Sequence, residues 1–367
     1  MSSLIVEVCE IKNVFHHPNA DRLDIAEVKG WHCIVGRNQY VVGDWVVFFP
    51  PDSVLPEYLV EKYDLEFLKK GGRVGTLKLR GYISQGLVLP VDCVGIKYNG
   101  YFTLGDDVKN VLGVTKYEVP ERHVQTQGKS TSRKVQNPYF TKYTDIENIQ
   151  NFDTVFQDGD MVVITEKIHG SNIRFGWLPI EINFKNGDWL GIIRSLWKKY
   201  VLGQTHEFVY GSHNVQLQWD NQDTFYGKNI YAKVIQDYDV ACLPLDVIFD
   251  GEVYGKGVQE LEYGRDDLDL IIFDIKSTTG YADYHTLVSV CQEHRLPIAP
   301  ELYIGDYYEG LLREHTEGNS TISIGNQIRE GCVIKSLHEE NHPRIGRKIL
   351  KSINPEYLAR KNRTEYH

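Results

Sequence analysis

The feature that most constrains this chain is a lysine in a short turn between two strand-like runs. Residues 161–168 read MVVITEKI and residues 172–178 read NIRFGWL, and such β-branched and aromatic runs are typical of strands. The turn contains Lys167, His169 and Gly170, and a glycine lets the backbone approach a ligand closely. A lysine becomes nucleophilic only when neighbouring cations, a metal or desolvation lower its pKa. Taken alone, the segment is therefore either a reactive site or an ordinary solvated strand end.

The chain from residue 146 onward alternates strand-like and helix-like runs. The strand-like runs include 244–255, 268–276, 330–337 and 347–353, and the helix-like runs are 224–240 and 283–296. This alternation indicates a second, larger domain. Residues 189–199 read WLGIIRSLWKK, with Leu190, Ile193, Leu196 and Trp197 at spacings of three and four. That spacing favours an amphipathic helix over a basic aromatic contact to RNA.

The first hundred residues contain shorter strand-like runs. LIVEVCEI, LDIAEVKG, HCIVG and WVVFFP are separated by Gly, Pro, Asn and Asp, which favours a small β-barrel or sandwich. The polar stretch EVPERHVQTQGKSTSRKVQNP follows and is typical of a linker. We therefore expect domains at 1–100 and 146–367, joined by a connecting segment at 101–145.

Composition and charge exclude several classes of protein. No run of 18 apolar residues and no basic-then-apolar leader is present, so neither a transmembrane helix nor a secretory signal is expected. The six cysteines form no CxxC pair, which favours reduced thiols in a cytoplasmic protein. The net charge of −10 opposes nucleic-acid binding, but residues 344–367 carry seven basic residues against two acidic ones. Such a cluster is either a phosphate contact or a solvated terminal helix.

The residues around and beyond the lysine turn resemble a known set of motifs in a known order. Lys167-x-His169-Gly170-x-Asn172 resembles motif I of the covalent nucleotidyltransferases. The histidine resembles RNA ligases, because DNA ligases and capping enzymes typically carry aspartate there. Four later segments resemble further motifs of the same enzymes. DGEVYG at 250–255 resembles motif III and IFDI at 272–275 resembles motif IIIa. EGCVIK at 330–335 resembles motif IV and RKILKS at 347–352 resembles motif V. The ordered set is far more specific than any one motif.

The N-terminal segment resembles the OB-fold tRNA-binding domain family at residues 17–23 (HPNADRL) and 80–86 (RGYISQG). An OB domain that precedes the catalytic domain resembles one group of RNA ligases. The resemblance implies an α+β protein: an N-terminal OB-like β-barrel followed by an ATP-grasp-like nucleotidyltransferase domain of antiparallel sheets with flanking helices. Direct RNA contact by the OB-like domain and a merely structural turn at residues 17–23 are equally compatible with the sequence.

The resemblance also implies an activity. It predicts an ATP-dependent RNA ligase that joins 3′-hydroxyl and 5′-phosphate ends through lysyl-AMP on Lys167 and an adenylated RNA, in RNA repair. ATP would donate AMP, with Mg²⁺ or Mn²⁺ present. RNA with such ends is the expected partner and no membrane contact is expected, whereas the sequence leaves protein partners unknown.

Site roles follow from the same resemblance. Lys335 and Lys351 would face the α-phosphate, and Glu330 would orient the waters of the metal. Glu252 would help hold the metal or bind the ribose instead. The remaining nucleotide contacts are expected from Glu166 at the adenine amino group, Phe273 stacked on adenine, and His169, Gly170 and Asn172.

Two positions depart from the pattern. Motif Ia usually contains Ser-Arg, whereas this chain has Ser212-His213, so His213 would be a weaker, pH-sensitive RNA contact unless another base substitutes. Motif V is often Lys-x-Lys, but Lys348 and Lys351 are three apart. In a strand they face opposite sides, so we favour Lys351 at the phosphate and assign Lys348 to RNA.

Three alternatives remain open from the sequence. One is another covalent nucleotidyltransferase, a DNA ligase or a capping-type enzyme. Another is a nucleic-acid-binding module with a degenerate catalytic domain. A tRNA-associated factor would account only for the first hundred residues.

Overall fold

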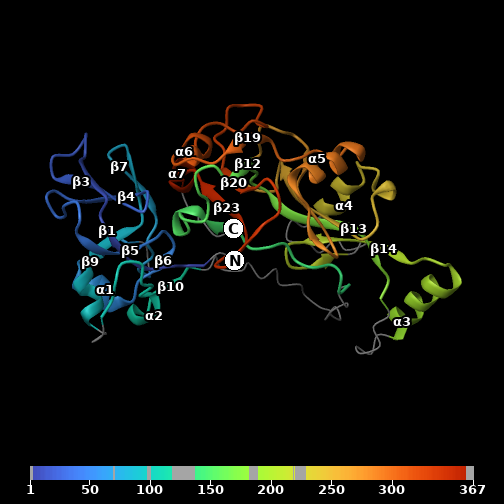
Figure 1. The fold of residues 1–367 in the computed structure, drawn as a ribbon, viewed down its shortest axis with the longest axis horizontal. Coiled ribbons are helices and arrows are strands. Elements are labelled where there is room, and N and C mark those ends of the chain that lie inside the picture. Colours follow the sequence, from blue (N-terminus) through green and yellow to red (C-terminus); the bar gives the residue numbers. More distant parts are fainter. Residues whose placement is uncertain are drawn as a thin grey trace.

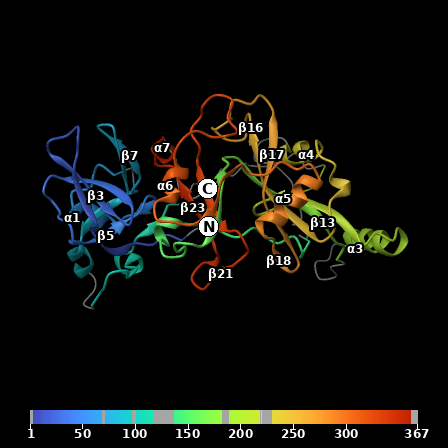
Figure 2. The same ribbon diagram turned by 45° about the horizontal axis from the view of Figure 1, so that its top comes forward.

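The computed structural model describes residues 3–68, 71–96, 101–117, 137–181, 189–217, 219 and 229–360. The molecule is elongated, with the N-terminal domain at one end, a five-stranded sheet in the middle and a six-stranded sheet beyond it (Figure 1). The same order is visible after rotation (Figure 2). No helix in the described part of the chain is long and apolar enough to cross a membrane.

The N-terminal domain is built from short antiparallel strands, as its sequence predicts. One sheet has the order β1-β5-β9 and a second β2-β3-β4, and two further sheets are the two-stranded pairs β7-β8 and β6-β10. The strands are β1 (Glu7–Glu10), β2 (Asn13–His16), β3 (Leu23–Val28), β4 (Trp31–Gly36), β5 (Trp45–Phe49), β6 (Ser53–Val54), β7 (Thr76–Leu79), β8 (Tyr82–Gln85), β9 (Leu87–Pro90) and β10 (Thr115–Lys116). Short helices α1 (Glu57–Lys62), η1 (Val91–Ile96) and α2 (Lys109–Leu112) close the domain.

Part of the expected connecting segment belongs to this domain instead. Val108, Leu112 and Val114 are buried in the same core as Val47 and Leu89. Residues 118–136 lie outside the described part of the chain, and residues 137–145 pack against the second domain, where Phe140 and Tyr143 are buried. The expected boundary at residue 100 was therefore too early, because the polar linker-like stretch begins only at residue 118 and residues 101–117 still carry apolar anchors.

The five-stranded sheet has the order β11-β23-β20-β12-β19. Its strands are β11 (Glu147–Asn148), β12 (Met161–Lys167), β19 (Glu301–Asp306), β20 (Gly331–Ser336) and β23 (Ile349–Ile353). All pairs are antiparallel except the short β11–β23 pair. One face packs against α6 (Leu311–Thr316) through Ile164, Cys332, Ile334 and Leu350. The helical turn η2 (Ile149–Asn151) and α7 (Pro355–Leu358) flank this sheet.

The six-stranded sheet has the order β15-β14-β13-β16-β17-β18 and is antiparallel throughout. Its strands are β13 (Ser171–Pro179), β14 (His206–Ser212), β15 (Gln216–Leu217), β16 (Val247–Gly255), β17 (Leu268–Ser277) and β18 (Gly280–Tyr281). Helices α4 (Ile230–Ile235) and α5 (Tyr284–Glu293) contribute Ile230, Val234 and Leu287 to the core on one face. The turn η4 (Val240–Cys242) and the pair β21 (Asn341–His342) and β22 (Gly346–Arg347) complete the domain.

The helix expected at 189–199 is present as α3 (Trp189–Leu196), followed by the π-helical turn η3 (Trp197–Val201). It projects away from the sheets at the end of the molecule farthest from the N-terminal domain (Figure 1). Its expected apolar face is only partly covered, because Ile193 and Trp197 are 57% and 53% exposed.

Candidate functional site

The central sheet brings the predicted lysines together on one face. Val333 of β20 is opposite Thr165 of β12 and Lys351 of β23. Directly opposed residues project to the same face, as do residues two apart along a strand. The register therefore places three lysines on the face opposite the α6 core, one from each of three neighbouring strands: Lys167, Lys335 and Lys351. Lys335 and Lys351 are buried, so their charges act in a medium that screens them weakly.

Lys348 lies on the other face, in the bend between β22 and β23. Its ammonium donates to a carboxylate oxygen of Asp160 at 2.8 Å and lies 5.3 Å from the ring of Phe156, which belongs to the α6 core. The structure therefore separates Lys348 from the three site lysines and engages it in ion pairs with Asp160 and Glu340. Its expected RNA contact gains no support from this position.

The turn after Lys167 carries the chain from one sheet to the other. Gly170 is pressed against β16: a Cβ at this position would lie 2.2 Å from the carbonyl oxygen of Val253 and 2.9 Å from Cγ of Glu252. Only glycine fits there without displacing the turn. The close approach expected at Gly170 is therefore an approach to the neighbouring strand, and it fixes where the lysine emerges.

Lys167 and Glu330 form the centre of the site. The Lys167 ammonium is 2.7 Å from Oε1 of Glu330, and Nδ1 of His169 is 3.6 Å from the other carboxylate oxygen. Burial alone would raise the pKa of Glu330, but Lys167 and His169 outweigh it and lower the pKa to about 2. Glu330 is thus an anion that holds the lysine in place.

His169 is buried beneath the turn rather than open to a ligand. Its backbone N–H donates to the hydroxyl of Tyr263 at 2.6 Å, and its Nδ1 is 3.1 Å from the hydroxyl of Tyr357. Nδ1 of its ring faces both the Tyr357 hydroxyl and the Glu330 carboxylate. A contact of His169 with the nucleotide stays a prediction.

Glu166 has one satisfied and one unsatisfied carboxylate oxygen. Its Oε2 accepts hydrogen bonds from the backbone N–H and the hydroxyl of Thr321 at 2.8 and 2.7 Å. Its Oε1 is buried and, within the described part of the chain, has no hydrogen-bond partner. Buried polar atoms are normally paired, so this oxygen is ready to accept a hydrogen bond from a bound molecule such as an amino group.

Asn172 and Glu252 face each other across β13 and β16. The buried Asn172 Oδ1 has no hydrogen-bond partner among the described residues. Burial raises the pKa of Glu252 to about 8, with Lys167 opposing the shift and Glu330 adding to it. Two carboxyl groups beside one lysine thus titrate far apart, a pattern that occurs at functional sites.

Phe273 reaches its position through a β-bulge. Asp250 and Gly251 of β16 pair with Asp274 and Ile272 of β17, so Phe273 is the extra residue. A bulge redirects side chains locally, and Phe273 packs against the cluster that contains Ile168, with its ring 5.0 Å from that of Tyr143. The half-buried ring is on the side of the lysine turn, as stacking on a base requires.

A buried ionic network beside Lys335 was not predicted from the sequence. Asp274 is fully buried and contacts Lys335 at 3.3 Å, Arg347 at 2.9 Å and the Tyr143 hydroxyl at 3.0 Å. Burial would raise the pKa of Asp274, but Lys335 and Arg347 outweigh it and lower the pKa. The only sequence signal was that Asp274 follows Phe273 in IFDI and that Arg347 opens RKILKS.

His213 follows β14 and supplies little positive charge. Burial lowers its pKa, Asp145 opposes this shift, and Arg174 and Lys142 add to it. Arg174 is no substitute, because it is completely buried and its guanidinium donates to the carbonyl oxygens of Phe140 and Ser212. The positive charge that an arginine would supply at position 213 is therefore not replaced by Arg174.

A protein-only metal site is absent from the described residues, since no three His, Cys, Asp or Glu side chains gather to hold an ion. Glu252 and Glu330 nevertheless both interact electrostatically with Lys167. Carboxylate oxygens suit a hard divalent cation that keeps several waters and also binds substrate phosphates, and a bound cation would favour the ionised form of Glu252. The donor set therefore fits Mg²⁺ or Mn²⁺ bound together with a nucleotide.

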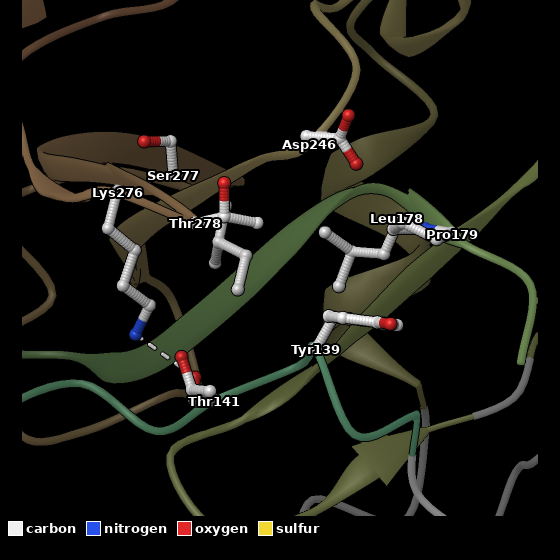
Figure 3. A pocket seen from close by; sticks show the side chains of 9 residues that line it. Tyr139, Thr141, Leu178, Pro179, Asp246, Lys276, Ser277 and Thr278 are labelled. Atoms are coloured by element: carbon white, nitrogen blue, oxygen red, sulfur yellow. Dashed lines mark hydrogen bonds between the residues drawn. The ribbon is translucent and has the colours of Figure 1, made fainter.

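A small cavity of about 60 Å³ lies elsewhere, at the opposite end of β13 from the lysine turn. It is lined by Tyr139, Leu178, Asp246 and Lys276, among others, and Lys276 donates to the carbonyl oxygen of Thr141 at 3.0 Å (Figure 3). None of the predicted site residues lines it.

Comparisons with known proteins identify two matching families. A family model described as RNA ligase matches residues 160–353, and one described as an OB-fold domain matches residues 5–91. Comparison with curated proteins gives no match. The match at residues 5–91 confirms the predicted N-terminal OB-fold.

Solved structures resemble the chain over almost its whole length. RNA ligase from Naegleria gruberi with PPi is 21% identical over 97% of this chain and 98% of that chain, with a TM-score of 0.67. A mutant of that ligase with ATP and Mn has the same identity and coverage and a TM-score of 0.68. A mutant with AMP and Mn is 21% identical over 96% and 98%, with a TM-score of 0.65. At this identity the likeness establishes a shared fold and confirms the predicted α+β class.

Proposed function

The chain belongs to the RNA ligase family, and we propose that it is an ATP-dependent enzyme that joins RNA ends through AMP carried on Lys167. The observation that carries this proposal is the convergence of three lysines and two carboxyl groups at one turn. Lys167, Lys335 and Lys351 share one sheet face, and Glu330 holds Lys167 at 2.7 Å. The solved N. gruberi ligase mutants were determined with ATP or AMP and Mn, which supports the same ligands here.

In the first step, unprotonated Nζ of Lys167 attacks the α-phosphorus of ATP. The bond between the α-phosphorus and the β-bridging oxygen breaks, pyrophosphate leaves, and the lysine loses its proton. Lys335 and Lys351 neutralise charge on the α-phosphate and disfavour a third protonated amine nearby. Asp274 fixes Lys335 for this role, since it contacts the Lys335 ammonium at 3.3 Å.

The nucleotide contacts follow from the unsatisfied atoms. Oε1 of Glu166 would accept from the adenine amino group, and the Asn172 side chain would bind a ribose or phosphate oxygen. Phe273 would stack on the base, with the edge of Tyr143 behind it. Glu252 and Glu330 would hold Mg²⁺ or Mn²⁺ through its waters, and the cation would neutralise phosphate charge.

Two further transfers complete sealing. The 5′-phosphate of RNA attacks lysyl-AMP, which releases Lys167 and forms an adenylated RNA end. The 3′-hydroxyl of the second end then attacks that 5′-phosphate, forms the phosphodiester and releases AMP. A cytoplasmic role in RNA repair is supported by the chemistry of the reaction and by the unpaired state of the six cysteines, all free thiols.

The substrate is tested with matched nicked duplexes that differ only in the sugar at the break. We expect sealing of an RNA 3′-hydroxyl to an RNA 5′-phosphate with ATP, and loss of sealing in Lys167→Ala. The Lys167→Ala variant should still join RNA that already carries a 5′-adenylate, because the final attack by the 3′-hydroxyl does not use the lysine. Equal sealing of all-DNA nicks would favour a DNA ligase, and labelling by GTP in place of ATP would favour a capping-type enzyme.

A further inference from the structure

Two buried tyrosines hold His169 from two directions. The hydroxyl of Tyr263 accepts a hydrogen bond from the His169 backbone N–H at 2.6 Å. The hydroxyl of Tyr357 lies 3.1 Å from Nδ1 of the His169 ring, and the two rings meet edge to face at 5.5 Å and 64°. Both tyrosines are completely buried, so their hydroxyls contact the catalytic turn and not solvent.

Tyr263 is held in a strained backbone conformation. It lies between β16 and β17 with a φ of 55°, which a bulky side chain rarely adopts. Its backbone N–H donates to Gln327 and its carbonyl oxygen accepts from Ile324, both at 2.9 Å. Such strain persists only when surrounding contacts enforce it and tends to occur at functional sites. Here it delivers a hydroxyl to the residue two positions after Lys167.

Tyr357 is carried by a helix that is anchored to Glu330 itself. Asn354 caps α7 by accepting a hydrogen bond from the N–H of Glu356, and its own N–H donates to the carbonyl oxygen of Glu330 at 2.9 Å. The backbone of Glu330 and the ring of His169 are therefore positioned by the same short element. Lys78 of β7 also reaches this element, 2.9 Å from Glu356.

These contacts converge on the Glu330 carboxylate. One oxygen is 2.7 Å from Lys167, and the other is 3.6 Å from His169 and, within the described residues, has no hydrogen-bond partner. The Glu330 carboxylate thus lies between two groups, with the Lys167 ammonium at one oxygen and the His169 imidazole facing the other. We propose that Tyr263 and Tyr357 are positioning residues that fix His169 and, through it, hold Glu330 in the orientation needed for adenylylation of Lys167. This inference rests on the proposed ligase function.

The chain offers a matched control for loss of a tyrosine hydroxyl. Tyr254 is buried in the same cluster as Tyr263 and Tyr357, and its hydroxyl donates to Asp269 at 3.0 Å, not to His169. Tyr→Phe at each position removes one hydroxyl and keeps the ring. A general effect of lost packing would appear in all three variants, whereas an effect through His169 would spare Tyr254→Phe.

The test is single-turnover labelling of Lys167 at a series of ATP concentrations with Mg²⁺. We expect the maximal labelling rate to fall about tenfold in Tyr357→Phe and Tyr263→Phe, as expected when a buried hydrogen bond is removed. Half-saturating ATP should stay within twofold of wild type, because neither hydroxyl is assigned a nucleotide contact. Tyr254→Phe should match wild type in both quantities. Thermal melting of each variant establishes that it is folded at the assay temperature, so that its labelling rate can be compared with that of wild type.

A double-mutant cycle separates positioning from an independent role. In a His169→Ala background, Tyr357→Phe should cause no further loss if it acts through the imidazole. Additive losses, unchanged rates in both variants, or an equal loss in Tyr254→Phe would overturn the inference. These outcomes differ from failure of the proposed function itself, in which wild type would form no nucleotidyl-lysine.

Discussion

Replacement of Gly170 by alanine tests how strictly the catalytic turn is placed. The new Cβ would lie 2.2 Å from the carbonyl oxygen of Val253, whereas ordinary contacts begin at 3.4 Å. The difference, 3.4 − 2.2 = 1.2 Å, must be absorbed by moving the turn away from β16, because the obstacle is backbone. A displacement of about 1 Å at a reacting group can cost about 100-fold in rate. The overpacking should also cost about 1–3 kcal/mol of stability.

The assay compares Gly170→Ala with Gly325→Ala, a glycine whose added Cβ would meet nothing within 4 Å. We expect Lys167 labelling by α-labelled ATP to fall about 100-fold in Gly170→Ala and to be unchanged in Gly325→Ala. Urea denaturation would measure the accompanying loss of stability. A Gly170→Ala enzyme that labels at the wild-type rate would refute the reasoning, because the turn would then tolerate the shift.

Three further predictions follow from the same structure. Lys351→Ala should abolish labelling of Lys167, whereas Lys348→Ala should label normally because that side chain is on the opposite face; the same labelling assay checks both. Burial raises the pKa of Asp250 from 3.8 to about 7, so the folded state resists its ionisation and stability should fall as pH rises from about 4 to about 7. A shift of about three pKa units at about 1.36 kcal/mol each corresponds to a fall of up to about 4 kcal/mol in the free energy of unfolding, and Asp250→Asn should remove this fall. Urea denaturation at a series of pH values measures it, and the same pH dependence in wild type and Asp250→Asn would contradict the prediction. Glu356→Gln breaks the ion pair with Lys78, whose two side chains are 47% and 50% exposed. The free energy of unfolding, measured by urea denaturation, should therefore change by less than about 1 kcal/mol.

The positions of strands in the second domain could be predicted from the sequence, because the apolar runs that favour strands there are also the segments that the fold buries. The runs 161–168 and 330–337 became β12 and β20 almost without change. Strand alternation predicted that Lys348 and Lys351 face opposite sides. The two side chains do diverge, but Lys348 lies in the bend between β22 and β23 and not within a strand, and the roles of both lysines stay predictions. The helix at 189–199 was likewise predicted, but the exposure of Ile193 and Trp197 depends on where the insertion projects, which the spacing does not encode.

The supporting residues of the site were not readable, because their partners are distant in sequence. Asp274 meets Tyr143, Lys335 and Arg347 only after both sheets have formed. The bulge that directs Phe273 depends on pairing with β16. His169 was expected to contact the nucleotide, and its burial between Tyr357 and Glu330 follows from α7, far along the chain. Motif residues were thus identified by type, whereas their roles required the tertiary contacts.

The most direct test of the account is the covalent adduct on Lys167. Wild type and Lys167→Ala are incubated with α-labelled ATP and Mg²⁺ or Mn²⁺, separated under denaturing conditions, and the labelled peptide is identified by mass spectrometry. We expect an acid-labile AMP on Lys167 in wild type and no label in Lys167→Ala. Folded wild type that stays unlabelled with either metal, or label on another residue, would contradict it.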